Sequence, residues 1–160
     1  MKEFARINTL IGTLGIQTNE KGVYRLYLEN KVDKNKKETP ENKRSFILQN
    51  ALNELKEYFE GEKKSFNVPL ELEIPRFYKK VLLEVAKVPF GETVSYKEIA
   101  KRVGNEKACR AVGSANANNP IAVFIPCHRI LASDGTLGGY GGGLDKKMIL
   151  LRHEGINLNL

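Results

Sequence analysis

The sequence has little cysteine and no long apolar run, and both shortages narrow the classes of protein that it can encode. Its 160 residues include two cysteines, Cys109 and Cys127, which are too few for a disulfide framework. These and the two histidines form no CxxC or HxxxH pair, so the sequence predicts no metal site. No apolar run approaches membrane-spanning length, and the start, MKEFARINTL, lacks the apolar core of a signal peptide. We therefore expect a cytoplasmic protein with no membrane partner.

The charge balance favours an anionic partner, and a glycine-rich segment indicates that this partner is not a nucleoside triphosphate. The net charge is +7 and the pI is near 9.4, which favours nucleic acid, although many basic proteins bind none. Segment 138–143, GGYGGG, lacks the GK[ST] ending of a phosphate-binding loop, so we expect no nucleoside triphosphate site. Its glycines instead let the backbone approach a flat ligand, with Tyr140 as a wall.

Residues 1–72 predict an α/β N-terminal domain with a small sheet and one helix. Apolar residues alternate over 4–29 and predict two strands around a turn. Segment 31–44 is rich in charge and has no evident apolar anchor, which favours a solvated loop over a DNA-binding arm. Ser45 then opens an amphipathic helix. Residues 66–75, with two prolines, are expected to form an extended linker.

Residues 73–160 predict a mostly α-helical domain with a winged-helix-like helix-turn-helix. One helix is expected over 76–87. Ser95 is the N-cap of a capping box, SYKE, and the helix that it opens ends at a glycine. A second helix over 106–116 follows almost at once, which makes the pair a helix-turn-helix candidate. Asp145 is the expected N-cap of a last helix.

The predicted helix over 106–116 has two interpretations. Its sequence, EKACRAVGSAN, surrounds one long cation, Arg110, with small side chains. Small side chains allow tight packing against a neighbouring helix, and on this segment alone that interpretation is favoured. In a basic protein the same surface allows close contact with DNA, with Arg110 as the projecting group and Ala111, Ser114 and Ala115 beside it.

Segment 121–130, IAVFIPCHRI, is the strongest candidate for a reactive site. Its first five residues predict a buried strand, which Pro126 stops because proline offers no N–H to a ladder. Cys127 follows at this rigid end, beside His128 and Arg129. A thiol next to an imidazole and a guanidinium is the setting in which a cysteine ionises and attacks an electrophile. A structural cysteine beside two surface polar residues has equal weight on these residues alone.

Glu154 lies in the last turn of the final predicted helix, where a negative charge opposes the helix dipole. One interpretation is an ordinary surface residue. The other is an acid held there to polarise a histidine. The residue type and its position leave both open.

Together, five motifs resemble the O6-alkylguanine-DNA alkyltransferases, a family of suicide DNA-repair proteins. They follow the family's order and spacing over residues 77–155: VPFGETVSYKEIA, RAVGSANANNP, IPCHRI, GGYGGGL and LLRHEG. Each motif is modestly specific, whereas the ordered set is very specific. The N-terminal half matches more loosely, chiefly through LKEYFEGEKKSFNVPL, and lacks the zinc ligands found in some members.

The resemblance implies repair of O6-alkylguanine in double-stranded DNA by base flipping and irreversible transfer of the alkyl group to Cys127. It implies one turnover per molecule, no cofactor and a monomer, and leaves O4-alkylthymine open as a second substrate. His128 would act as the base through a water, oriented by Glu154. The implied site also includes Asn119, Tyr96 and Lys147 for catalysis, Arg110, Tyr96, Ala111, Ser114, Ala115 and Arg129 for DNA, and Val123, Tyr140, Gly141 and Gly142 for the base pocket.

Several of these residues have specific roles in the family that the motifs resemble. Asn119 would tie the helix-turn-helix to the cysteine segment. Arg110 would fill the gap left by the flipped base, and Tyr96 would push the phosphate that rotates the nucleotide. Lys147 would assist the departing guanine, and Tyr140 would wall the guanine pocket.

Two departures and three rival functions qualify the resemblance. Gly141 stands where some relatives carry a side chain, so a lesion contact there must come from its backbone N–H. Leu82 stands where a tryptophan is common and is expected in the core. A thiol hydrolase would also use Cys127 and His128, a plain helix-turn-helix regulator would use Arg110, and a lesion sensor would bind alkylated DNA without reacting.

Overall fold

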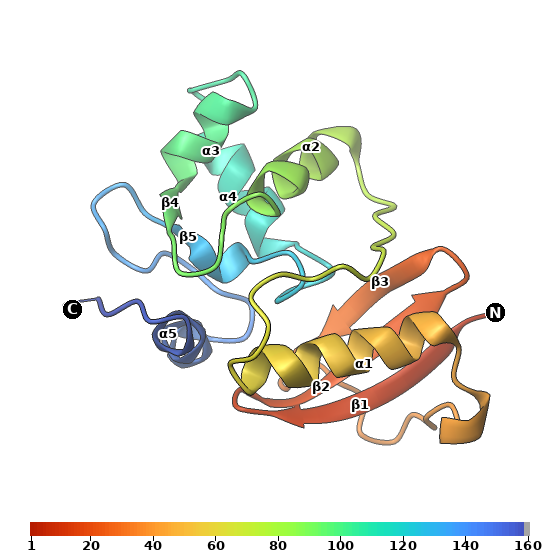
Figure 1. Cartoon of the computed structure of the whole chain (residues 1–160). Helices are drawn as coiled ribbons and strands as arrows, with labels where there is room; N and C mark the ends of the chain where they lie inside the picture. The colour runs from red at the N-terminus through yellow and green to blue at the C-terminus, as the bar shows by residue number, and fades with distance from the viewer. Residues whose placement is uncertain (159–160) are drawn as a thin grey trace. The chain divides into compact units, whose positions relative to one another are not determined.

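The structure is a computed structural model that describes residues 1–158 and consists of two compact units. The first is Met1–Leu72 and the second Glu73–Leu160; the colours of Figure 1 run through them in chain order. The expected fold class, a small sheet with a helix followed by a mostly helical part, is confirmed. Within the described residues, no helix has both the length and the apolar character needed to cross a membrane.

The sheet of the first unit has three antiparallel strands instead of the two expected: β1 (Glu3–Thr9), β2 (Gly12–Asn19) and β3 (Gly22–Tyr27). Two tight turns connect them, since Thr9 pairs with Gly12 and Asn19 pairs with Gly22. Gly15 lies inside β2. A Cβ atom at Gly15 would lie 2.7 Å from Val32 and 2.9 Å from Phe4, so packing explains the glycine.

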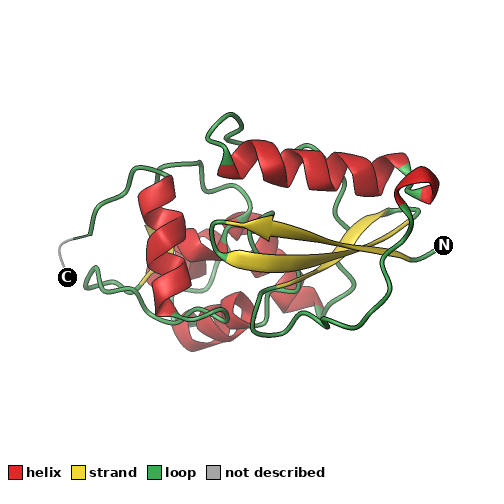
Figure 2. Ribbon diagram, turned by 90° about the horizontal axis from the view of Figure 1, so that it is seen from below, coloured by secondary structure: helices red, strands yellow, loops and turns green. Residues whose placement is uncertain are grey.

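Helix α1 (Phe46–Phe59) covers one face of this sheet, as Figure 2 shows. The expected N-cap is confirmed, because Ser45 Oγ accepts a hydrogen bond from Leu48 N at 3.3 Å. The apolar stripe of α1 follows the helical period: Leu48, Ala51, Leu55 and Tyr58 are fully buried. This amphipathic face joins the helix to the sheet.

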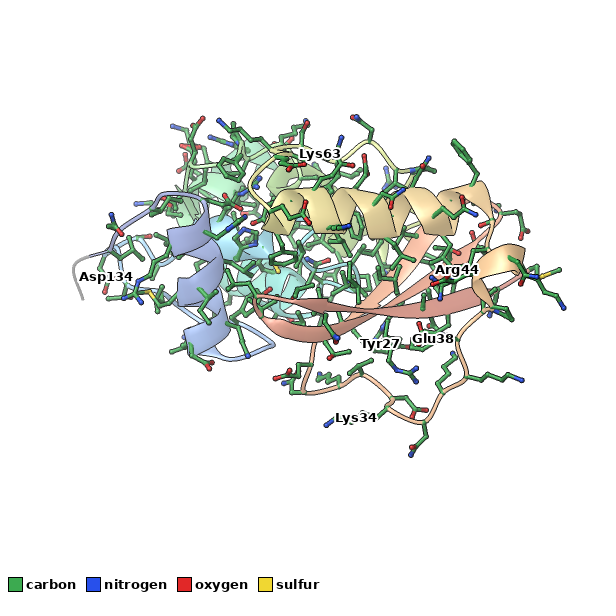
Figure 3. All side chains as sticks on the ribbon, turned by 60° about the horizontal axis from the view of Figure 1, so that its bottom comes forward. Tyr27, Lys34, Glu38, Arg44, Lys63 and Asp134 are labelled. Atoms are coloured by element: carbon green, nitrogen blue, oxygen red, sulfur yellow. The ribbon has the colours of Figure 1, made fainter. Side chains whose placement is uncertain are left out.

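Segment 31–44 is anchored to the sheet, so the expectation that it has no apolar anchor was wrong. Val32 is buried, and the Arg6 guanidinium of β1 donates to a backbone carbonyl of the segment at 2.7 Å. Glu38 lies 3.5 Å from both Arg6 and Arg44, and Figure 3 shows it beside Arg44. The charges of this segment therefore pair with the sheet and with the start of α1.

The expected linker is packed against the first unit over its first residues. The Glu54 carboxylate of α1 is buried and accepts hydrogen bonds from the backbone N–H groups of Asn67 and Val68 at 2.9–3.0 Å. Lys63 Nζ lies 3.4 Å from the same carboxylate. The chain then runs beside β3 through one bridge. The two prolines predicted an extended linker, but the buried Glu54 carboxylate fixes the backbone of residues 67 and 68.

Glu54→Ala is expected to lower the free energy of unfolding by about 2–4 kcal/mol, because two enclosed N–H groups lose their acceptor. Urea denaturation followed by circular dichroism measures the change. Glu57→Ala on the same helix is the control and should shift stability by less than about 0.5 kcal/mol. Equal effects of the two substitutions would mean that solvent replaces the Glu54 carboxylate.

Over its described residues, 73–158, the second unit has five α and 3-10 helices and two short strands: α2 (Arg76–Val85), β4 (Val94–Ser95), α3 (Tyr96–Arg102), α4 (Cys109–Ala117), η2 (Cys127–Arg129), β5 (Ile130–Leu131) and α5 (Leu144–His153). Figure 1 shows α2, α3 and α4 grouped together, with β4 and β5 side by side. The two strands are parallel and pair over two residues each. This pair is the small wing beside the helices.

Helices α3 and α4 form the helix-turn-helix. Ser95 Oγ accepts a hydrogen bond from Glu98 N at 3.0 Å, which confirms the N-cap of α3. Gly104 ends α3 at φ 86°, as glycine at a helix end commonly does. Helix α4 begins at Cys109, later than the expected 106, because Ala108 N donates to Asn105 O in a turn.

Helix α5 starts with a different cap from the expected one. Gly143, at φ 102°, is the N-cap, and it makes no side-chain cap hydrogen bond. Asp145 lies in the first turn, where its charge favours the positive end of the helix dipole. Asp145 therefore supports the helix start through charge instead of through a capping bond.

Candidate active site

The chain before the cysteine is a buried tight turn, not the strand expected over 121–125. Ile125 N donates to Ile121 O at 3.0 Å, and Val123 has a φ of 73°. A left-handed backbone is rare for a β-branched residue, and such strain clusters at functional sites. Asn119 closes the turn: its Nδ2 donates to Ile125 O at 2.9 Å, and its Oδ1 accepts from Ile121 N at 3.0 Å.

Cys127 begins η2 and is 4% exposed. Burial raises the pKa of its thiol, while hydrogen bonding from Asn119 and the charge of Lys147 oppose that rise. One interpretation of the sequence was a thiolate beside an imidazole and a guanidinium, but the effect of desolvation on the Cys127 pKa dominates. The resting site therefore holds a neutral thiol, which needs a local base before it can attack.

His128, the residue expected to act as that base, has a side chain that is fully buried against a carboxylate. His128 Nε2 lies 2.7 Å from Glu154 Oε2, and neither side chain is exposed. A carboxylate accepts, so Nε2 carries the proton and Nδ1 keeps its lone pair. Burial lowers the pKa of His128 despite the opposing effect of Glu154, so the resting imidazole is neutral. Nδ1 has no hydrogen-bond partner among residues 1–158 and is free to accept a proton.

Glu154 joins three separate segments. Besides His128, it accepts from Arg129 Nε at 2.8 Å, from Arg129 Nη2 at 3.0 Å and from Gly91 N at 3.0 Å. It is the C-cap of α5 and is 5% exposed. The surface interpretation of this acid is therefore wrong. The energy of these bonds outweighs its unfavourable place near the negative end of the helix dipole.

Arg129 is buried and bonded within the protein, which is contrary to the expectation that it is available to contact DNA. Its side chain is buried, two of its nitrogens donate to Glu154, and Nη1 donates to Val88 O at 2.6 Å. The guanidinium also lies 5.9 Å from the centre of the Phe90 ring. Arg129 therefore balances the buried carboxylate and attaches it to the turn after α2.

Lys147 is buried in α5 and surrounded by carbonyls. Its Nζ donates to Ile130 O at 2.7 Å, to Gly139 O at 3.1 Å and to Leu137 O. An ammonium has three donors, so none remains for the leaving guanine in this state, contrary to the expected role. Burial lowers the pKa of Lys147 to about 8, while the nearby Cys127 opposes this shift. Lys147 thus holds the glycine-rich loop and places a positive charge near the thiol.

A pocket of about 400 Å³ opens between α3, α4 and the glycine-rich loop. Its lining residues are Tyr96, Gly113, Asn116, Ala117, Gly139, Tyr140 and Gly141. Tyr140 and Gly141 were expected there, whereas Tyr96 was expected at the phosphate. Val123 and Gly142 are not among the lining residues, and Val123 is enclosed in the turn described above. Burial raises the pKa of Tyr96, partly offset by hydrogen bonding from Asn116, so Tyr96 keeps its hydroxyl proton.

Asn116 is a site residue that the sequence interpretation missed. It is 5% exposed, and its Nδ2 donates to Cys127 O at 3.2 Å. Val112, Ala115 and Asn116 form the buried stripe of α4. An asparagine in a stripe of helical period is unusual, and that pattern was the available signal.

The outer face of α4 carries three of the six residues that were expected to contact DNA. Arg110, Ala111 and Ser114 are exposed, and Ser114 Oγ lies 2.7 Å from the Tyr78 hydroxyl. Ala115 is fully buried, so the expectation that it contacts DNA was wrong. One face of α4 therefore packs on the unit, as the packing interpretation expects, while the other face is exposed and DNA contact there stays a prediction.

Nothing in the described part of the chain resembles a metal centre: among residues 1–158, no three His, Cys, Asp or Glu side chains are grouped to hold an ion. The chemistry available is that of a thiol, an imidazole and a carboxylate beside a pocket. Together with the helix-turn-helix, these features define a DNA-modifying protein that reacts through cysteine.

Comparison with known families gives the same class. Residues 76–156 match the DNA binding domain of 6-O-methylguanine DNA methyltransferase, and residues 4–72 match its ribonuclease-like domain. The chain belongs to the 6-O-methylguanine DNA methyltransferase family. It is 43% identical over 154 residues to the methylated-DNA–protein-cysteine methyltransferase of Methanosarcina acetivorans, covering 95% of this chain and 97% of that protein.

Solved structures agree. The O6-methylguanine methyltransferase of Mycobacterium tuberculosis matches with a TM-score of 0.83 at 35% identity, covering 96% of this chain and 93% of that one. The Mycobacterium tuberculosis OGT solved in complex with DNA matches with a TM-score of 0.85 at 35% identity, covering 94% of this chain and 91% of that one. The family fold therefore extends over both units.

Glu154→Gln is expected to slow the reaction of Cys127 with free O6-benzylguanine by at least about tenfold at neutral pH, because a neutral amide replaces the carboxylate whose charge stabilises the His128 imidazolium. The thiol has a raised pKa, so its thiolate fraction and the reaction rate rise with pH. At alkaline pH the thiolate forms without a base, and the difference between parent and variant should shrink. Rate constants measured across pH test this.

The control for this experiment is the melting temperature of the variant, which shows where it is folded. Glu154→Gln leaves the buried Arg129 without its partner charge, so we expect a lower melting temperature, and rates are compared where both proteins are folded. A variant profile that overlays the parent profile would remove Glu154 from catalysis.

Proposed function

We propose that the chain repairs DNA by moving the alkyl group of O6-alkylguanine to the Cys127 thiol. The observation that carries the proposal is the buried Cys127, His128 and Glu154 set behind a pocket on a helix-turn-helix unit. The relatives named as methylated-DNA–protein-cysteine methyltransferases support the reaction. The partner is double-stranded DNA carrying the lesion. We further propose that the protein acts in the cytoplasm as a monomer and needs no cofactor.

The chemistry follows from the protonation states. Neutral His128 takes the thiol proton at Nδ1, directly or through a water, and Glu154 stabilises the imidazolium that forms. The Cys127 sulfur then attacks the alkyl carbon, a C–S bond forms, and the C–O bond to guanine breaks. Guanine leaves as an anion unless it receives a proton, and the imidazolium proton restores it to the neutral base.

The product explains why each molecule reacts once. The alkylated cysteine is a thioether, which has no proton to lose and so cannot form a thiolate, and the cysteine thiolate is a poor leaving group at carbon. The group formed by Cys127, His128 and Glu154 has no second thiol. Cys109 lies at the start of α4, and its Sγ is 3.7 Å from Glu106 O. We propose that the protein is consumed by one transfer.

The pocket requires that the base leaves the duplex. Extruding a base costs a few kcal/mol, and less when the lesion already weakens pairing. We propose that the exposed face of α4 contacts DNA, that Arg110 fills the gap and that Tyr96, at the pocket, presses on the phosphate. Tyr140 then forms a wall of the base site.

Cys127→Ser is expected to abolish alkyl transfer and retain binding to alkylated duplex, whereas Cys109→Ser leaves transfer within about twofold of the parent. The measurement incubates each protein with a duplex containing O6-methylguanine and weighs the peptide that carries residue 127. The expected product gains one methyl group in place of a hydrogen, in a ratio of one per molecule.

The same measurement separates the rivals. A lesion sensor binds the duplex with no mass gain, a thiol hydrolase turns over, and a plain regulator shows no preference for the lesion. Stoichiometric transfer by Cys127→Ser would refute the assignment of the acceptor.

Arg110→Ala is expected to slow repair of duplex DNA by at least about tenfold and leave reaction with free O6-benzylguanine near the parent rate, because only a stacked base must be flipped. Single-turnover rates on both substrates test this. Arg102→Ala, an exposed cation on α3, is the matched control for loss of charge. Equal losses on both substrates would mean that Arg110 supports the pocket or the fold.

A further inference from the structure

The two polar atoms of the Asn116 amide differ: within residues 1–158, Nδ2 is hydrogen-bonded and Oδ1 is not. Its Nδ2 donates to Cys127 O at 3.2 Å, which sets the orientation of the amide, because the opposite orientation would place two oxygens together. Its Oδ1 is buried and has no hydrogen-bond partner among the described residues. A buried acceptor without a donor is costly, so native proteins rarely keep one without a use.

The place of this oxygen indicates a ligand. Asn116 lines the pocket together with Tyr96 and Tyr140, and it is bonded to the backbone of the reacting residue. The side chain is 5% exposed, so it is an enclosed polar group at the pocket wall and not a surface residue. A ligand that places a hydrogen-bond donor at this wall would satisfy Oδ1.

The chemistry of the lesion leaves one donor that fits. Alkylation at O6 removes the N1 proton of guanine, so N1, N3 and N7 are all acceptors. The exocyclic 2-amino group is then the only donor on the base. O4-alkylthymine has no donor on its ring, because N3 has lost its proton in the same way.

We propose that Asn116 Oδ1 accepts a hydrogen bond from the 2-amino group of the flipped O6-alkylguanine and so selects guanine lesions over thymine lesions. This inference rests on the proposed function and adds a specificity-determining residue to it. Nδ2 holds the backbone carbonyl of Cys127 at the same time, so one amide connects base recognition to the position of the acceptor.

The test removes the two partners of the proposed hydrogen bond one at a time: the 2-amino group from the substrate and the Asn116 oxygen from the protein. Two duplexes differ in one group: one contains O6-methylguanine and the other O6-methylhypoxanthine, the same base without its 2-amino group. Single-turnover methyl transfer to Cys127 is measured on both, and the ratio of the two rate constants is compared between proteins. Damage to the thiol or the fold acts on both substrates and cancels in the ratio.

The parent is expected to favour O6-methylguanine, and Asn116→Leu is expected to reduce this preference on the order of tenfold, the effect of one buried hydrogen bond. Asn116→Asp keeps an acceptor oxygen and should retain the preference even if its overall rate falls. Asn118→Leu, an exposed residue at the end of α4, is the matched control and should leave the ratio unchanged. The parent is likewise expected to favour O6-methylguanine over O4-methylthymine, and Asn116→Leu is expected to reduce that preference.

Each outcome decides the inference. A ratio in Asn116→Leu that equals the parent ratio would overturn it, and so would loss of the preference in a folded Asn116→Asp. The Asp variant alone decides if the Leu variant does not fold. Transfer that fails on both duplexes in the parent would instead refute the proposed function, so the two failures are distinguishable.

Discussion

The buried carboxylate of Glu154 holds the second unit's reactive site together. It comes from the end of α5 and binds His128 and Arg129 of η2 and the backbone of Gly91 in the turn before β4. A single buried acid would be very unfavourable, but a bidentate guanidinium, an imidazole and an amide compensate it. The cost of removing any partner keeps these segments in one arrangement, and that arrangement sets the tautomer of His128.

The electrostatics of the site keep the Cys127 thiol neutral, and therefore weakly nucleophilic, in the resting state. Desolvation raises the pKa of Cys127 and lowers that of His128, so both are neutral at rest. Lys147 adds a positive charge that favours the thiolate once the proton moves. A buried neutral thiol is protected from oxidants and chance electrophiles, which suits a residue that reacts once.

Helix α4 shows how nine residues serve packing, recognition and chemistry. Val112 and Ala115 pack inward, Arg110 lies on the open face, and Asn116 reaches both the pocket and the Cys127 backbone. Small side chains make this possible because they bring the helix close to its neighbours without filling the pocket wall. The helix that exposes Arg110 is thus bonded directly to the segment that carries Cys127.

Local chemistry was readable from the chain because it acts over a few residues. Serine caps at Ser45 and Ser95 and the Cys127–His128 pair depend on neighbours within one turn. The burial of Arg129 and Ala115, the turn before Cys127 and the role of Asn116 were not readable in the same way. Arg129 depends on a distant partner, because Glu154 is 25 residues away and itself binds Gly91, 63 residues away. Asn116 and the turn before Cys127 use nearer partners, but only the folded backbone brings those groups together. A periodic pattern marks which side chains are buried, but only the folded chain brings a distant donor to a buried acceptor.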